Sequence, residues 1–203
     1  LAVCAVAAEE KRASPIPLEK GTKWVYEAKV QWTPTAGEKG GPGVRSARLK
    51  WTTEVLDCVE SNSVRAAVVH AFPREIAGLD PAKPDGYTVL VETTNSLCYA
   101  PAESAAAASQ LARAFVAAPE KLDAVNVLLE LPLHADKRWG CMGSPSREDG
   151  WYCWRVEAEK APTLKFKGLS SDEYFTVITV AFRTNPDHEV IDIFPGVGIT
   201  HLE

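Results

Sequence analysis

The chain has 203 residues, of which 46% are hydrophobic and 24% are charged. That length supports one ordinary hydrophobic core, so we expect a single domain. The formal net charge of −5 is spread along the sequence, which argues against a nucleic-acid-binding surface and against a polybasic membrane anchor. No later stretch approaches the roughly 18 apolar residues that cross a bilayer, so we expect no transmembrane span.

Residues 1–8 are typical of the end of an export signal. They are apolar, and Val6 and Ala8 occupy the two positions at which a signal peptidase accepts small residues. We expect cleavage after Ala8, which leaves residues 9–203 as the mature domain in the periplasm, the outer envelope or the extracellular space. The alternative is a lipid anchor on Cys4, although Val3 stands where lipoproteins carry a small residue.

Four cysteines remain after the signal: Cys58, Cys98, Cys141 and Cys153. An even number in an oxidising compartment indicates two disulfides, for which three pairings are formally possible. We favour Cys141–Cys153, because a turn-rich loop separates these two residues, and therefore Cys58–Cys98. Zinc binding is disfavoured because closely spaced cysteine pairs are absent, and we expect neither a metal nor another cofactor.

The first half of the chain reads as strands. Apolar and polar residues alternate from residue 23 to residue 33, and again from residue 47 to residue 55. A glycine-rich stretch separates the two runs, which therefore predict an antiparallel hairpin. Residues 63–72 are apolar at successive positions, which is typical of a central strand covered on both faces.

Helices are expected in the middle of the chain. After short strands at residues 87–92 and 97–99, the alanine-rich run 103–118 predicts a helix. Pro119 ends it and permits a second helix over residues 120–130. Strands are then expected at residues 151–158, 163–167, 174–183, 190–194 and 199–203.

This order of strands, helices and strands predicts an α+β fold with an antiparallel sheet packed against one or two helices. No polar tail follows the last strand. Either the natural chain continues past Glu203, or Leu202 and Glu203 come from cloning.

Three segments carry a resemblance to known proteins. They are Pro17 to Tyr26, Leu131 to Trp139, and Phe194 to Ile199. In this order they resemble a broad group of uncharacterised bacterial exported proteins and lipoproteins, which have a G-x-x-W-x-Y opening strand and a G-V-G closing strand. Asp136 stands where that group has glycine in the middle segment. The resemblance implies a curved, half-barrel-like sheet that carries lipoproteins or other apolar ligands, and it implies no catalytic residue.

Candidate catalytic and metal-binding residues are scattered. His134 and Asp136 form too small a ligand set for a metal, and His188 lies beside acidic residues that alternate on a strand. His70 fits a buried core position. No G-x-S-x-G nucleophile motif occurs. Paired carboxylates for glycoside cleavage are available at Glu157, Glu159, Asp172 and Glu173.

Aromatic residues give the more specific hypothesis. Trp24, Tyr26, Trp32 and Trp51 share a face of the first hairpin, where they are candidate ligand-binding residues under the alanine-rich helix. Filling the core is the simpler role for them. A second aromatic group surrounds the Cys141–Cys153 loop, and at least one of Trp151, Tyr152 and Trp154 is expected to be exposed or covered by another element.

These observations predict a non-enzymatic, exported bacterial envelope protein that serves as a binding or assembly module, with an unknown protein or an apolar small molecule as its partner. The first alternative is a carrier of a lipid or other apolar ligand in a cavity between sheet and helix. The second is a hydrolase that uses paired carboxylates.

Overall fold

The structure is a computed structural model that describes residues 14–32, 43–61, 63–73, 86–120, 126–140, 151–160, 176–184 and 187–203. These residues form two compact units. One is Leu18–Leu133, and the other comprises the described residues up to Pro17 and from His134 onward. The prediction of a single domain over residues 9–203 stays a prediction.

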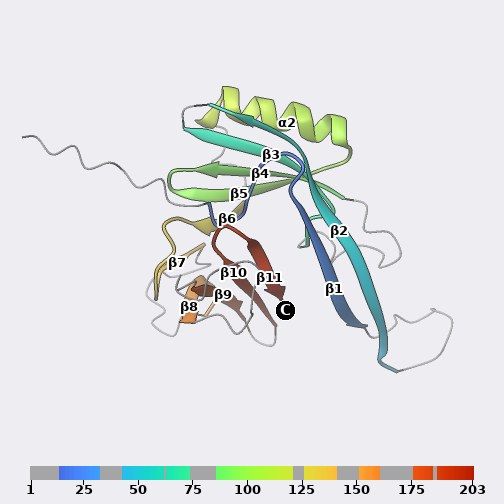
Figure 1. Ribbon diagram of the computed structural model, residues 1–203. Coiled ribbons are helices and arrows are strands. Elements are labelled where there is room, and N and C mark those ends of the chain that lie inside the picture. The colour runs from blue at the N-terminus through green and yellow to red at the C-terminus, as the bar shows by residue number, and fades with distance from the viewer. Residues whose placement is uncertain are drawn as a thin grey trace, which may run out of the picture. The chain divides into compact units, whose positions relative to one another are not determined.

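The first unit contains a curled, half-barrel-like antiparallel sheet with six strands in chain order (Figure 1). The strands are β1 (Lys23–Trp32), β2 (Arg45–Glu60), β3 (Val64–His70), β4 (Tyr87–Thr93), β5 (Ser96–Ala102) and β6 (Asn126–Glu130). Strands β1 and β2 form the predicted hairpin, with Tyr26 opposite Trp51 in register. The α+β class and the curved antiparallel sheet are confirmed.

Strand β2 is long enough to pair with two neighbours in succession. Its first part, from Arg45 to Glu54, pairs with β1, and its last part, from Glu54 to Glu60, pairs with β3. The register shifts between Val55 and Asp57, which is the signature of a β-bulge. Within the described part of the chain, residues 45–53 therefore have a strand neighbour on one side only, and with β1 they form a two-stranded ribbon that extends beyond β3 (Figure 1).

Helix α2 (Ala105–Ala117) covers one face of this sheet, as the alanine content predicts. Ser104 caps its start, where its hydroxyl accepts a hydrogen bond from the Ala107 N–H at 3.2 Å. Ala108, Ala112 and Phe115 face the sheet. They join Val64, Ala66, Val68, Val89, Val91 and Cys98 in one buried cluster.

Strand β3 is buried on both faces, as predicted. Ala66 and Val68 lie under α2, while Ala67 and Val69 point to the opposite face and are fully buried there.

The predicted second helix over residues 120–130 is wrong at its end. Residues 126–130 form strand β6, which pairs with β5 at the edge of the sheet. A register shift opposite Leu97 and Cys98 allows both Leu128 and Leu129 to be buried, although they are adjacent in the sequence. Two apolar residues of the predicted second helix therefore belong to a bulged strand. Residues 121–125 lie outside the described part of the chain.

The second unit contains a five-stranded antiparallel sheet with the strand order β11-β10-β9-β8-β7. Its strands are β7 (Arg138–Trp139), β8 (Trp154–Lys160), β9 (Val177–Arg183), β10 (His188–Phe194) and β11 (Gly198–Leu202). Four of the predicted strands correspond to β8, β9, β10 and β11, with shifted ends. The strand predicted at residues 163–167 lies outside the described residues.

The predicted Cys58–Cys98 disulfide is wrong, because both residues are free thiols. Cys58 is on β2 and Cys98 is on β5, with β3 and β4 between them. Three strand spacings of about 4.8 Å separate them by about 14 Å, whereas a disulfide needs Cα atoms within about 7 Å. Cys153 is disulfide-bonded. Its predicted partner Cys141 lies outside the described residues, so that pairing stays a prediction.

The two thiols provide a direct test of the sheet order. We expect iodoacetamide to modify both Cys58 and Cys98 when the protein is denatured without reductant. In the folded protein Cys98 should react more slowly, because it is buried whereas Cys58 is partly exposed. Burial raises the pKa of both thiols, which lowers their reactivity near neutral pH. Peptide mass spectrometry measures both results, and a peptide pair linked through Cys58 and Cys98 would contradict the strand order.

Candidate functional site

Three of the four predicted aromatic residues of the first hairpin, Trp24, Tyr26 and Trp51, lie on one face of the β1–β2 ribbon. In register, Trp24 lies opposite Thr53 and Tyr26 lies opposite Trp51. The rings of Tyr26 and Trp51 stack, with their centroids 5.4 Å apart and their planes at 27°. Burial raises the pKa of the Tyr26 hydroxyl. Trp32 pairs with Arg45 through the backbone register, but its side chain lies outside the description.

Smaller apolar residues continue this face along the ribbon. We call the set the aromatic stripe, and it consists of Trp24, Tyr26, Ala28, Ala47, Leu49 and Trp51. All six are partly buried and alternate with exposed residues of the opposite face. Among the residues that the structure describes, the stripe is therefore an apolar surface on a ribbon of two strands.

The carbonyl of Ala71 fixes the inner end of the stripe. It accepts hydrogen bonds from the Trp51 indole N–H at 3.2 Å and from the Thr53 hydroxyl at 2.6 Å. Ala71 follows β3 with a φ of 53°, a backbone conformation that residues other than glycine rarely adopt. The two donors thus link the ribbon to the end of β3.

The stripe does not lie between the sheet and α2. Alternation along β2 puts Trp51 and Thr53 on the same face as Val55, which pairs with Val69. Helix α2 instead packs on the face that contains Ala66 and Val68. The prediction that these aromatic residues lie under the alanine-rich helix is therefore wrong. The cavity between sheet and helix that they were expected to line is wrong for the same reason.

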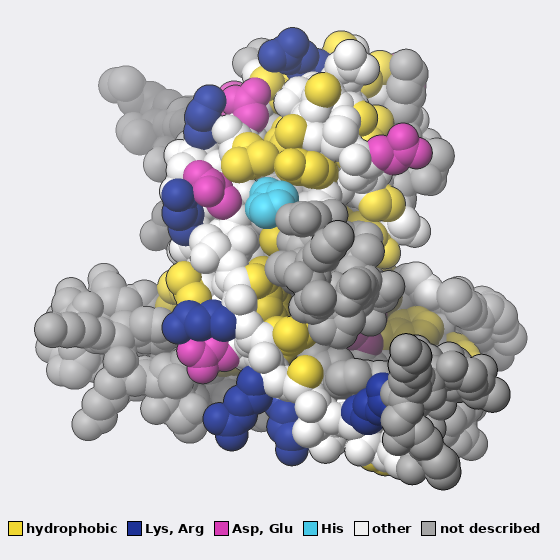
Figure 2. All heavy atoms as spheres, turned by 90° about the vertical axis from the view of Figure 1, so that its right-hand side faces the viewer, with side chains coloured by type: hydrophobic (Ala, Val, Ile, Leu, Met, Phe, Trp, Pro, Cys, Tyr) yellow, Lys and Arg dark blue, Asp and Glu magenta, His cyan; other side chains and the backbone are white. Residues whose placement is uncertain are grey.

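The other face of the ribbon is polar. Lys23 pairs with Glu54 at 3.2 Å and Lys50 pairs with Glu27 at 3.1 Å, both across the two strands. Val25 lies between these pairs and is 62% exposed. Acidic and basic side chains also lie next to one another, with hydrophobic ones between them, on the face of the molecule in Figure 2.

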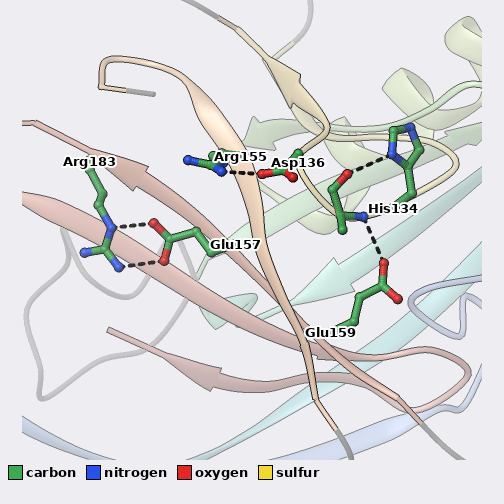
Figure 3. A network of polar contacts seen from close by, with 7 residues as sticks. His134, Asp136, Arg155, Glu157, Glu159 and Arg183 are labelled. Atoms are coloured by element: carbon green, nitrogen blue, oxygen red, sulfur yellow. Dashed lines mark hydrogen bonds and ion pairs between the residues drawn. The ribbon is translucent and has the colours of Figure 1, made fainter. Parts of the chain in front are cut away.

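In the second unit, strand β8 carries a row of charged side chains with specific partners (Figure 3). The Arg155 guanidinium donates a hydrogen bond to Asp136. Arg183, on β9, donates two hydrogen bonds to the Glu157 carboxylate, at 2.5 Å and 2.7 Å. Glu159 accepts a hydrogen bond from the Ala135 N–H at 2.9 Å. Alternating charges at residues 155, 157 and 159 were the signal in the sequence, but their partners depend on strand pairing.

The two carboxylates of β8 that were candidates for glycoside cleavage both have hydrogen-bond partners. Both carboxylate oxygens of Glu157 accept hydrogen bonds from Arg183, and Glu159 accepts one from the backbone N–H of Ala135. The other two acidic candidates, Asp172 and Glu173, lie outside the described residues. The described carboxylates of β8 thus have structural partners.

Metal ligation finds no support in the described ranges, where no three His, Cys, Asp or Glu side chains are arranged to hold an ion. Asp136 is bound to Arg155, and the His134 ring contacts the Ala135 carbonyl at 3.1 Å. His188 lies 3.4 Å from Glu203 rather than within an acidic cluster. His70 is partly buried against the Tyr87 ring, with centroids 5.2 Å apart.

The second aromatic group is mostly core. The rings of Trp139 and Trp154 stack with their centroids 6.3 Å apart. The ring centroid of Trp154 also lies 5.4 Å from that of Phe182. Both tryptophans are buried, whereas Trp151 is 36% exposed, so one aromatic residue is exposed as expected. Its placement on a strand face is wrong, because Trp151 and Tyr152 form a turn before β8.

Asp136 adopts the backbone conformation that glycine takes most readily. Its φ is 63°, and it occupies the position at which the resemblance places glycine. The turn therefore has a left-handed residue although glycine is absent, and aspartate tolerates this conformation better than most residues do. Arg155 binds its side chain and lowers the pKa of the carboxyl group, with a smaller effect from Arg138.

No helix in the described ranges is long and apolar enough to cross a membrane.

The left-handed turn predicts an order of stability among variants. We expect Asp136→Ala to melt about 2 °C below Asp136→Gly, because both lose the ion pair but only alanine is strained at this φ. The gain for glycine is partly offset by the greater freedom of its unfolded chain. Ala135→Gly is the matched control, since Ala135 lacks a positive φ and glycine should lower its Tm. Thermal unfolding by circular dichroism measures all three variants, and the opposite order at position 136 would contradict the assignment.

The ion pair between Asp136 and Arg155 predicts how the Asp136 carboxyl group titrates. We expect the pKa of Asp136 to lie below its ordinary value of about 3.9 and to rise toward it in Arg155→Gln. Because the folded-state pKa is lowered, the ion pair stabilises the fold above the ordinary pKa, and this contribution is lost as the pH falls through the folded-state pKa. NMR titration of the carboxyl carbon measures the shift. Arg183→Gln should leave it unchanged, and an equal response to both variants would contradict the pairing.

Comparison with known proteins adds no assignment to this geometry: no protein-family model, curated protein or solved structure matches the chain. A functional conclusion therefore depends on the two surfaces just described, the aromatic stripe and the charged row of β8.

Proposed function

We propose that this protein is a non-enzymatic binding module whose aromatic stripe takes an apolar molecule. The observation that carries the proposal is the position of the stripe on a ribbon of two strands beyond the end of β3. A two-stranded ribbon in water is at best marginally stable by itself. An apolar face on such a ribbon gains stability when a further apolar surface covers it, and a bound ligand supplies that surface.

The composition of the stripe favours binding over simple core packing. Large aromatic residues with a polar atom, such as Trp24, Tyr26 and Trp51, are enriched at binding surfaces. Each keeps part of its surface exposed, in contrast to the core residues under α2. Catalysis has less support, because the described carboxylates of β8 are bound to Arg183 and to a backbone N–H.

We also propose that the protein is exported by a bacterium. The support is the sequence of residues 1–8 and the disulfide-bonded state of Cys153, since disulfides are typical of oxidising compartments. Cys58 and Cys98 do not add to this support, because both are free thiols.

A charge placed within the stripe tests the binding function. We expect the uncharged fluorescent probe N-phenyl-1-naphthylamine to bind the wild-type protein, and Leu49→Glu to raise its dissociation constant at least about ten-fold, because a carboxylate loses hydration beside an apolar ligand. Val25→Glu is the matched control. It places the same charge on the same ribbon, but on the polar face, and should leave the affinity unchanged. Fluorescence titration measures the affinity, and circular dichroism confirms that both variants fold.

Trp51→Phe provides a second variant. It keeps an aromatic ring in the stripe but removes the hydrogen bond to Ala71. We therefore expect it to lower the Tm, and to raise the dissociation constant of the probe less than Leu49→Glu does. Equal probe binding by the wild type, Leu49→Glu and Val25→Glu would show that the stripe is not the binding surface.

A further inference from the structure

The ribbon is electrically asymmetric along its length. In its inner half, residues 23–27 and 50–54, two lysines and two glutamates cancel. In its outer half, residues 28–32 and 45–49, there are three basic residues, Lys29, Arg45 and Arg48, and no acidic residue. The outer half therefore carries a charge of about +3 on a chain whose formal net charge is −5.

Two of these cations are direct neighbours. Lys29 lies opposite Arg48 in the register of β1 and β2, and both side chains are exposed. Like charges in directly opposed positions of an antiparallel pair are unfavourable. The two inner charged positions of the same face show the opposite arrangement, since Lys23 faces Glu54 and Lys50 faces Glu27. Positive potential thus accumulates at the outer end of the ribbon.

The third cation belongs to the face of the stripe. Along β2, residues 45, 47, 49 and 51 are partly buried and alternate with exposed residues at 46, 48 and 50. Arg45 therefore follows Ala47, Leu49 and Trp51 on the same face, at the outer end of the row. A guanidinium presents a planar set of donors that fits a phosphate or a carboxylate.

The length of the row suits one hydrocarbon chain. Arg45 lies six positions before Trp51, which corresponds to about 20 Å along a strand. One leaflet of a bilayer is about 15 Å of hydrocarbon, half of its core thickness. A lipid-sized chain beside Ala47, Leu49 and Trp51 would thus place a head group within reach of Arg45.

We infer that the ligand of the aromatic stripe is an anionic amphiphile with a single apolar chain, bound with its head group at the outer end of the ribbon beside Arg45. This inference rests on the proposed binding function, to which it adds the charge and the direction of the ligand. The stripe contributes apolar contact, and Arg45 contributes charge-assisted hydrogen bonds. Lys29 and Arg48 raise the local positive potential without touching the apolar chain, because they lie on the other face.

Competition among three amphiphiles of equal chain length tests the inference. Dodecyl phosphate and dodecyltrimethylammonium, each below its micelle concentration, and dodecanol, below its solubility limit, displace the neutral probe from the wild-type protein. We expect dodecyl phosphate to act at a concentration at least about ten-fold lower than dodecyltrimethylammonium, with dodecanol between them. Added salt should reduce this preference, because the cations are partly exposed.

Arg45→Gln should remove most of the preference for dodecyl phosphate over dodecanol, with each ligand's displacement measured relative to the neutral probe's own affinity for that variant. Lys23→Gln is the matched control, because it removes a cation from the inner end and the polar face of the same ribbon, and it should keep the preference. Equal displacement by dodecyl phosphate and dodecanol, or an unchanged preference in Arg45→Gln, would overturn the inference. The binding function would still be supported if Leu49→Glu weakens probe binding. If Leu49→Glu leaves probe binding unchanged, both the inference and the binding function are overturned.

Discussion

Strand β2 determines the architecture of the first unit, because it exchanges one partner for another along its length. It pairs with β1 as far as Glu54 and with β3 from there on, and the bulge between Val55 and Asp57 marks the change. A bulge bends a strand and increases its local twist. The outer part of β2 is thereby released from the body of the sheet, while its inner part remains in the layer that α2 covers.

The exchange also separates two kinds of apolar surface. Under α2, the side chains are small and β-branched, such as Ala66, Val68 and Val89, which allows the alanine face of the helix to approach closely. On the ribbon three of the six apolar residues, Trp24, Tyr26 and Trp51, are large and aromatic, and the stripe lies on the opposite face of the sheet. The first surface is a packed core. The second is narrow, partly exposed and bounded by charge, and these properties suit the reversible contact of an apolar molecule better than they suit a permanent core.

Local patterns predicted the elements well where one physical rule dominates. Alternation predicted β1 and the outer part of β2, and alanine content predicted α2. The failures occur where tertiary contacts decide. Leu128 and Leu129 fall within the predicted second helix, but residues 126–130 instead pair with β5 as a bulged strand. Cys58 and Cys98 satisfied the counting rule for disulfides, yet two intervening strands keep them apart.

The candidate site was predictable only in part. Alternation was sufficient to place Trp24, Tyr26 and Trp51 on one face, because side chains on a strand repeat every two residues. It did not reveal which face α2 covers, since that depends on the bulge in β2. The ion pairs of Arg155 and Arg183 were equally hidden, because their acidic partners are 19 and 26 residues away in the sequence and become neighbours only through strand pairing.

The polar face of the ribbon has a consequence for colloidal behaviour. Strand β1 is the first strand of its sheet, and within the described part of the chain it pairs with β2 alone. An edge strand of ten residues is a template on which other chains can add strands and aggregate. Lys23, Glu27 and Lys29 alternate along this edge, and an incoming chain would have to bury or match each charge. These charges therefore protect the protein from edge-to-edge association, and one of them, Lys29, also contributes to the basic outer end of the ribbon.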